Sequence, residues 1–131
     1  MAHNIQAAIA DMQESIAAIS WAGDVVLEER EKGTNNLVTI TPSDIEEEYR
    51  FGEVKRSYSM EVKVYFAGKN EIDPATVHQR CRDINNALLI DRKRGGNALG
   101  TITSTWGVEE NEGRNSVVMT SDPIIQTLET C

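Results

Sequence analysis

The sequence is poor in cysteine, proline, aromatic side chains and long apolar runs. It contains two cysteines and three prolines, and 5% of its residues are aromatic. Cys81 falls within a predicted helix and Cys131 is the last residue, so they do not make a disulfide framework. We expect two reduced thiols in a cytosolic setting. No stretch approaches the roughly 20 apolar residues of a membrane span, and residues 1–20 lack the basic and apolar regions of a secretory signal.

Positive charge is also scarce. Lys and Arg number 13 against 21 Asp and Glu residues, which gives a net charge of −8. This charge argues against a general nucleic-acid binder, which needs basic side chains to displace counterions from phosphates. It also argues against docking on anionic membranes. The length of 131 residues and the apolar content of 40% predict one domain, residues 1–131, with a substantial core.

Apolar residues at steps of three and four predict an N-terminal amphipathic helix over residues 4–20. Its stripe consists of Ile5, Ile9, Met12, Ile16 and Ile19. Gly23 follows as a terminator. Residues 25–41 then predict a hairpin with its turn at residues 32–36, which Pro42 ends. Residues 42–56 are polar and acidic, and we interpret them as a loop.

Strict alternation of apolar and polar residues over residues 58–66 predicts a strand that is wet on one face. Its apolar side chains are Tyr58, Met60, Val62, Val64 and Phe66. A second helix follows, with Asp73 as N-cap, Pro74 in the first position and a stripe of apolar residues ending at Leu88. Gly95 and Gly96 can adopt positive φ and stop it.

Two further β segments close the chain, over residues 101–108 and 116–128, with a turn at residues 109–115. Pro123 predicts an edge position or a bend in the last one. Trp106 shares a predicted face with apolar neighbours, which favours the core, whereas Trp21 could be core or an interface anchor. The order α-β-β-β-α-β-β predicts an α+β domain, with two helices packed on one face of a mostly antiparallel sheet.

No group of residues in the sequence forms a coherent catalytic or ligand-binding site. His78 and Cys81 have the spacing of metal ligands on a helix, but two ligands do not make a zinc site. A Cys–His nucleophile pair is also disfavoured, because Cys81 lies on the apolar stripe. The glycines of residues 95–100 follow a helix and open a strand, the reverse of a phosphate-binding loop. We therefore expect a protein that is not an enzyme and that binds no cofactor and no metal.

Charge clusters are the remaining candidates for function. Arg92, Lys93 and Arg94 follow the second helix, where cationic side chains ordinarily complement the helix dipole. The alternative is a contact between these cations and an acidic segment of another copy. The candidate interface residues are Glu46, Glu47, Glu48, Arg50, Arg92, Lys93 and Arg94. This hypothesis predicts that Arg94→Glu weakens oligomers without changing monomer stability.

The order of elements resembles that of the tail terminator, or tail completion, proteins of long-tailed bacteriophages. The resemblance covers nearly the whole chain as a pattern, and its most telling piece is a helix, then Asp91, then Gly95 and Gly96 before a strand. Where the family pattern has an apolar residue before the glycine pair, this chain has Arg94.

The resemblance implies a structural role in the virion, with assembly in the host cytoplasm. Such proteins form a hexameric ring that caps the tail tube, stops its polymerisation and meets the neck, and genomic DNA later passes through the lumen without specific binding. The implied partners are sister copies, the tail tube protein and a neck or head-completion protein. Two alternatives stay open. One is another ring protein of the neck, a connector or stopper, and the other is a cytosolic ligand-binding or regulatory α+β domain unrelated to phage.

Overall fold

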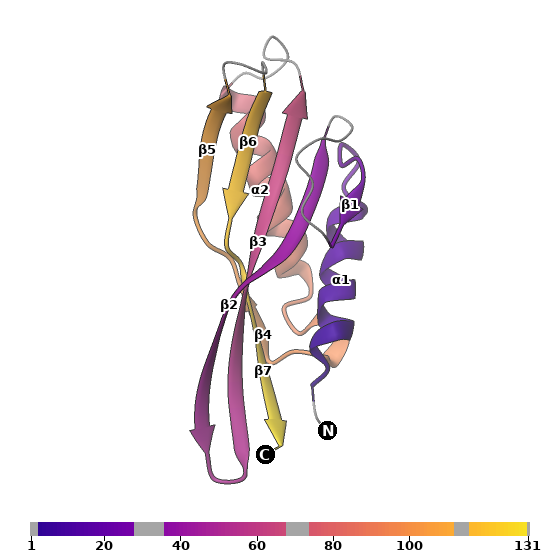
Figure 1. Cartoon of the computed structure of the whole chain (residues 1–131). Helices are drawn as coiled ribbons and strands as arrows, with labels where there is room; N and C mark the ends of the chain where they lie inside the picture. The colour runs from indigo at the N-terminus through magenta and orange to yellow at the C-terminus, as the bar shows by residue number, and fades with distance from the viewer. Residues whose placement is uncertain (1–2, 28–35, 68–73, 112–115, 131) are drawn as a thin grey trace.

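The computed structural model describes residues 3–27, 36–67, 74–111 and 116–130. Within them two α-helices and one short 3₁₀ helix accompany a seven-stranded sheet, and the predicted α+β class is confirmed (Figure 1). The elements are α1 (Ile5–Ala17), β1 (Val25–Val26), β2 (Leu37–Arg50), β3 (Glu53–Ala67), α2 (Pro74–Ile90), η2 (Arg94–Gly96), β4 (Gly100–Ile102), β5 (Trp106–Asn111), β6 (Ser116–Ser121) and β7 (Ile124–Thr130).

Strand β3 is the spine of the sheet. It pairs antiparallel with β2 along one edge, and along the other edge with β6 and then β7. Strands β5 and β4 pair with β6 and β7 in turn. The predicted bend at Pro123 is confirmed, because β6 ends at Ser121 and β7 begins at Ile124. The predicted closing turn falls partly on residues 112–115, which lie outside the described residues.

The predicted antiparallel hairpin over residues 25–41 is wrong, because β1 runs parallel to β2. Val25 lies opposite Val38 in this parallel pair. The backbone N–H of Val38 donates to the Asp24 carbonyl at 2.8 Å, and the Gln13 side chain of α1 donates to the Val25 carbonyl at 2.7 Å. These bonds fix the direction of β1, which apolar patterning alone does not report. Residues 32–35 of the expected turn lie outside the described residues.

The predicted loop over residues 42–56 is also wrong. Strand β2 continues through Pro42 to Arg50, and β3 begins at Glu53, so the segment is a long hairpin closed by two residues. Proline is tolerated there because the pairing register shifts between Pro42 and Asp44, and residues 42–50 pair on one side only. Gly52 allows the tight turn with a φ of 68°.

The core lies between the two helices and one face of the sheet. Met60, Val62 and Val64 are at most 3% exposed, which confirms the predicted apolar face of this strand. Tyr58 packs against the same core, and the side chain of Phe66 lies outside the described part. From the helices the core takes Ala8, Met12 and Ile16 of α1 and Val77, Cys81, Ile84 and Leu88 of α2. The helices therefore pack along the upper and middle parts of the sheet in Figure 1.

The helix ends follow their local sequence. The side chain of Asn4 caps α1 by accepting from the Ala7 N–H at 3.1 Å. The proposed N-cap of α2, Asp73, lies outside the described residues. After α2, Gly95 and Gly96 adopt φ values of 68° and 89°, as predicted. The Asp91 carboxylate accepts from the Gly95 N–H at 2.8 Å and so holds this turn.

Both tryptophans pack against the core while their N–H groups remain paired. Trp106 donates to the Asn85 side chain at 3.0 Å, and the predicted core position of Trp106 is confirmed. Trp21 donates to the Asp83 carboxylate at 2.9 Å, and the Arg80 guanidinium lies 5.0 Å from its ring centroid. Trp21 therefore joins the end of α1 to α2.

Candidate interaction surface

The lower part of the sheet projects beyond the helices as an arm (Figure 1). We define the arm as residues 44–50 of β2 and 53–59 of β3, with β7 (Ile124–Thr130) alongside. Residues 42–50 of β2 are all exposed. Their outer edge pairs with no strand among the described residues, so alternate backbone N–H and C=O groups face outward there. An exposed strand edge of this kind is a ready surface for another chain.

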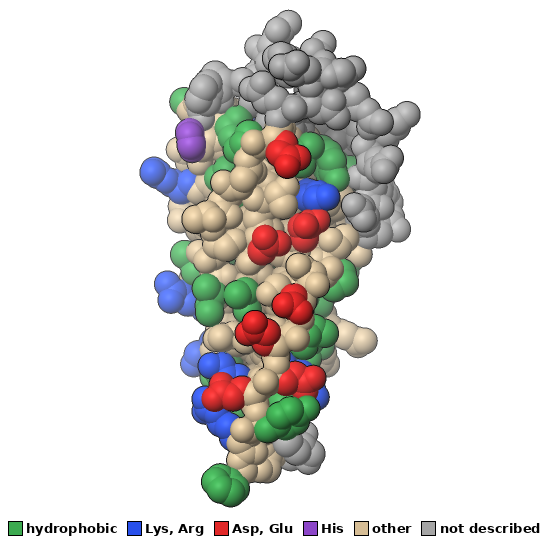
Figure 2. Space-filling view, turned by 60° about the vertical axis from the view of Figure 1, so that its left-hand side comes forward, with side chains coloured by type: hydrophobic (Ala, Val, Ile, Leu, Met, Phe, Trp, Pro, Cys, Tyr) green, Lys and Arg blue, Asp and Glu red, His purple; other side chains and the backbone are tan. Residues whose placement is uncertain are grey.

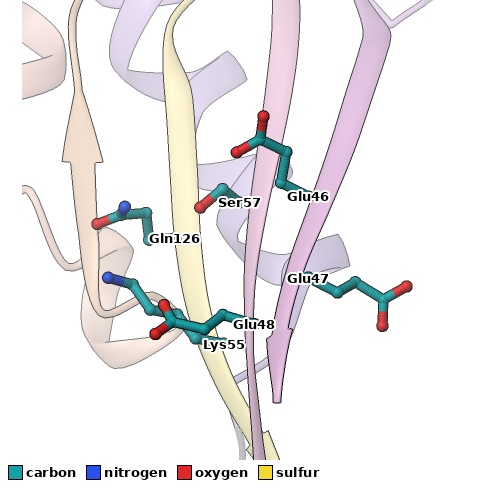
Figure 3. A pocket seen from close by; sticks show the side chains of 6 residues that line it. All are labelled: Glu46, Glu47, Glu48, Lys55, Ser57 and Gln126. Carbon is teal, nitrogen blue, oxygen red and sulfur yellow. The ribbon is translucent and has the colours of Figure 1, made fainter.

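One face of the arm is acidic. Figure 3 shows Glu46 and Glu48 on the same side of the sheet as Ser57 and Gln126, whereas Glu47 points to the opposite side. Together with Lys55, these side chains line a depression of about 260 Å³. Charged side chains along an open edge also discourage unspecific pairing. The acidic face therefore fits a surface that selects its partner by charge.

The opposite face of the arm is held by a polar network. The guanidinium of Arg56 lies 2.7 Å from the Glu129 carboxylate and 3.4 Å from that of Glu47. Tyr58 and Thr127 donate to Glu129 at 3.3 and 3.2 Å. Burial raises the pKa of Glu129, but the bonds from Arg56, Thr127 and Tyr58 outweigh it, and the pKa is lowered overall. The network joins all three strands of the arm, and so makes it rigid.

Replacing Glu129 tests this network through pH. A carboxylate whose folded-state pKa is depressed stabilises the fold above its unfolded pKa, and this contribution disappears as pH falls through the folded value. We expect Glu129→Gln to lower the melting temperature at pH 7, and the gap from the native protein to close in acid below about pH 4. Thermal melts from pH 7 to pH 2.5 measure it, with Glu53→Gln on exposed arm surface as the control. A gap that does not change with pH would contradict the assignment.

The charge cluster after α2 does not lie as predicted, because Arg94 is buried. Its side chain is 0% exposed, and its Nη1 atom lies 3.1 Å from Asp11 Oδ1 and 3.2 Å from the Ser15 hydroxyl. Its Nη2 donates to the Leu88 carbonyl, and its Nε has no hydrogen-bond partner among the described residues. Burial lowers the pKa of Arg94, and the Asp11 and Asp91 carboxylates oppose that effect.

Arg94 therefore joins α1 to the end of α2, and its side chain is not on the surface, where the predicted contact with another copy would form. The reason is its backbone: with a φ of 50°, Arg94 turns inward before the glycine pair. Arg92 and Lys93 are exposed as expected. Among the described residues no ion pair joins them to the acidic face of the arm. The interface role of Arg92, Lys93 and the four arm residues stays a prediction.

Acidic side chains are spread along one face of the molecule down to the arm, as Figure 2 shows. A hydrophobic side chain projects at the free end of the arm in the same view. The turn there carries Tyr49 and Phe51, which are 71% and 107% exposed. These two aromatics were not among the predicted interface residues, although Gly52 beside them is a turn signal.

The residues considered for catalysis or metal binding do not form a site. His78 is exposed, whereas Cys81 is buried with its Sγ 3.2 Å from Met119 Sδ. Burial raises the pKa of the Cys81 thiol, which makes it a weak nucleophile. Within the described residues no three His, Cys, Asp or Glu side chains are grouped to hold a metal ion. No described helix is both long and apolar enough to cross a membrane.

Comparison with known proteins gives a structural relative. The sequence matches no protein-family model and no curated protein. Its fold matches a chain in the structure of the virion of a native gene transfer agent (GTA) particle, with a TM-score of 0.69. The match covers 91% of this chain and 92% of that chain at 12% sequence identity. The two chains share a fold. At this identity the likeness extends to architecture and no further.

Proposed function

We propose that this chain is a non-enzymatic structural protein of a phage-like virion that caps the tail tube as a ring. In this role it ends tube polymerisation and forms the joint to the head or neck. The observation that carries the proposal is the near end-to-end structural match to a chain of a virion. The match concerns nearly the whole domain, as the tail terminator resemblance does.

Two features of the described residues support a role in assembly. The arm projects from the helix-covered body with an open strand edge and exposed aromatic side chains. Exposed apolar side chains on a projecting element are typical of contact surfaces. The charged residues of the arm give such a contact its selectivity. Partners of this kind are sister copies, the tail tube protein and a neck protein.

Removing the protein from assembling particles tests the proposed function. When the gene for this chain is deleted, we expect the assembled particles to carry tail tubes of uncontrolled length, because nothing ends polymerisation. Electron microscopy of negatively stained particles measures the length distribution, and restoring the gene in trans is the control. Tubes of normal length that fail to join heads would contradict tube capping.

A neck or connector ring is the second candidate. The structural match favours it equally, since it identifies a virion chain and not that chain's position. The same deletion separates the two candidates. A connector leaves tube length unchanged and yields separate heads and tails, whereas a terminator changes the length itself.

A further inference from the structure

The two most exposed large apolar side chains of the described chain lie on different surfaces. Phe51 is 107% exposed and Ile90 is 86% exposed. Phe51 lies at the turn of the projecting arm, while Ile90 is the last residue of α2. Each leaves apolar surface exposed to water, which is unfavourable unless another molecule covers it.

The tip of the arm, residues 49–52, is an exposed apolar knob that carries one cation, Arg50. Tyr49, Arg50 and Phe51 surround the turn, and Tyr49 Oη donates to Glu47 at 2.9 Å. Arg50 lies 3.5 Å from Glu48, but both side chains are more than half exposed, at 54% and 62%. An ion pair in such exposure contributes little and exchanges readily for a better partner.

The end of α1 and the end of α2 enclose an apolar groove of about 390 Å³. It is lined by Ser15, Ala18, Ile19, Ser20, Asp83, Asn86, Ala87 and Ile90. Small side chains keep the groove open, and its single charged lining residue is Asp83. Trp21 and Gln79 donate to the two Asp83 oxygens at 2.9 and 2.8 Å, which fixes the carboxylate. A carboxylate has about four acceptor sites, so it can receive a further donor.

We propose that the arm tip of one copy docks in the α1–α2 groove of the next copy. Phe51 covers Ile90, and Arg50 of the tip faces Asp83 of the groove. The occupant is a second copy because the chain itself carries both complementary surfaces. Both are apolar, and the knob offers the cation Arg50 where the groove offers the carboxylate Asp83. The tip does not fold back onto its own groove, because β7 pairs along β3 and holds the arm away from the helices (Figure 1).

The contact joins two different surfaces of one chain, so it is heterologous and propagates head to tail. Such contacts close into rings when the rotation between copies permits. The inference deepens the proposed function and rests on it, since it names the contact between neighbouring subunits of the ring. One aromatic buried at such a contact removes about 150–250 Å² from water, so the tip supplies a substantial anchor.

Cysteine cross-linking tests the contact. In the full chain carrying Cys131→Ser, the variants Phe51→Cys and Ile90→Cys are made separately and mixed under mild oxidation. We expect a Phe51→Cys to Ile90→Cys disulfide dimer far above the yield from Phe51→Cys mixed with Val108→Cys. Val108 is the matched control, because it is 48% exposed on another strand. Mass spectrometry of the digested dimer identifies the joined peptides.

A second variant tests the charge at the contact. Arg50→Glu added to Phe51→Cys places a carboxylate opposite Asp83, so we expect the yield with Ile90→Cys to fall several-fold. Yields equal to the Val108→Cys control, or dimers joined only between two Phe51→Cys chains, would overturn the proposal. Failure here is distinguishable from failure of the proposed function, because tail length in the deletion experiment does not depend on where the subunits touch.

Discussion

Arg94→Ala is expected to lower the free energy of unfolding by about 3 kcal/mol, roughly 10 °C in melting temperature. The guanidinium is completely buried between α1 and the turn after α2, beside Asp11, Ser15 and the Leu88 carbonyl. Alanine leaves a cavity, and it leaves a buried carbonyl without this donor. The loss falls at the lower end of the range for a broken buried pair, because the Asp11 side chain is 33% exposed and can be hydrated.

Lys93→Ala is the matched control for this prediction. Lys93 is the neighbouring cation and is exposed, so its removal should change stability by no more than about 0.5 kcal/mol. Chemical denaturation of the three proteins at one pH measures the differences. Equal stability of Arg94→Ala and Lys93→Ala would show that the buried guanidinium does not hold the helices together. Arg94→Glu should be worse than alanine, since it places two carboxylates side by side.

The case of Arg94 shows what the sequence could not reveal. Three consecutive cations after a helix are ordinarily solvated, and composition gives no reason to separate Arg94 from Arg92 and Lys93. Arg94 differs from its two neighbours in backbone conformation, because it has a φ of 50° and its side chain turns inward to α1. The position before the glycine pair is therefore an interior one, although it holds an arginine.

The helices and strands that contribute to the core were predictable, because burial of one face makes apolar residues recur at regular spacing in the sequence. This spacing is clear in β3, at Met60, Val62 and Val64, and in α2, at Ile84 and Leu88. Residues 44–50 of the arm show no such spacing, because their side chains are exposed on both faces. This part of β2 is held by its hydrogen bonds to β3, and Arg56 ties β3 to β7. A strand so rich in charged residues has the composition of a loop, and the sequence therefore predicts one.

The candidate surface was predictable only in part. Sequence analysis identified the acidic residues Glu46, Glu47 and Glu48, and the structure adds that alternation places Glu47 on the opposite face. The proposed contact between Phe51 and Ile90 could not have been inferred from sequence. Each looks like an isolated exposed apolar residue until the fold places one on a knob and the other at a groove.

Val62→Asn is expected to remove about 3–6 kcal/mol of stability, a large share of the roughly 5–15 kcal/mol typical of a domain. Val62 is 0% exposed at the centre of β3, between Val64 and Met60 on the covered face. Burying its side chain contributes about 1.5–3 kcal/mol. An asparagine loses that contribution and brings a buried amide with no partner, at about 1–3 kcal/mol more.

Lys63→Asn is the matched control, since it places the same side chain one residue along the same strand. Lys63 lies on the opposite face, where its ammonium is 3.2 Å from Glu61 and its side chain is 27% exposed. The new residue is therefore the same in the two variants, which differ in burial and, by at most about 1 kcal/mol, in the strand propensity of the residue that is replaced. We expect Lys63→Asn to cost at most about 1 kcal/mol, the value of an exposed ion pair. Similar losses in both variants, measured by urea unfolding, would mean that the helices do not cover this face of the sheet. The arm would then have no helix-covered body from which to project.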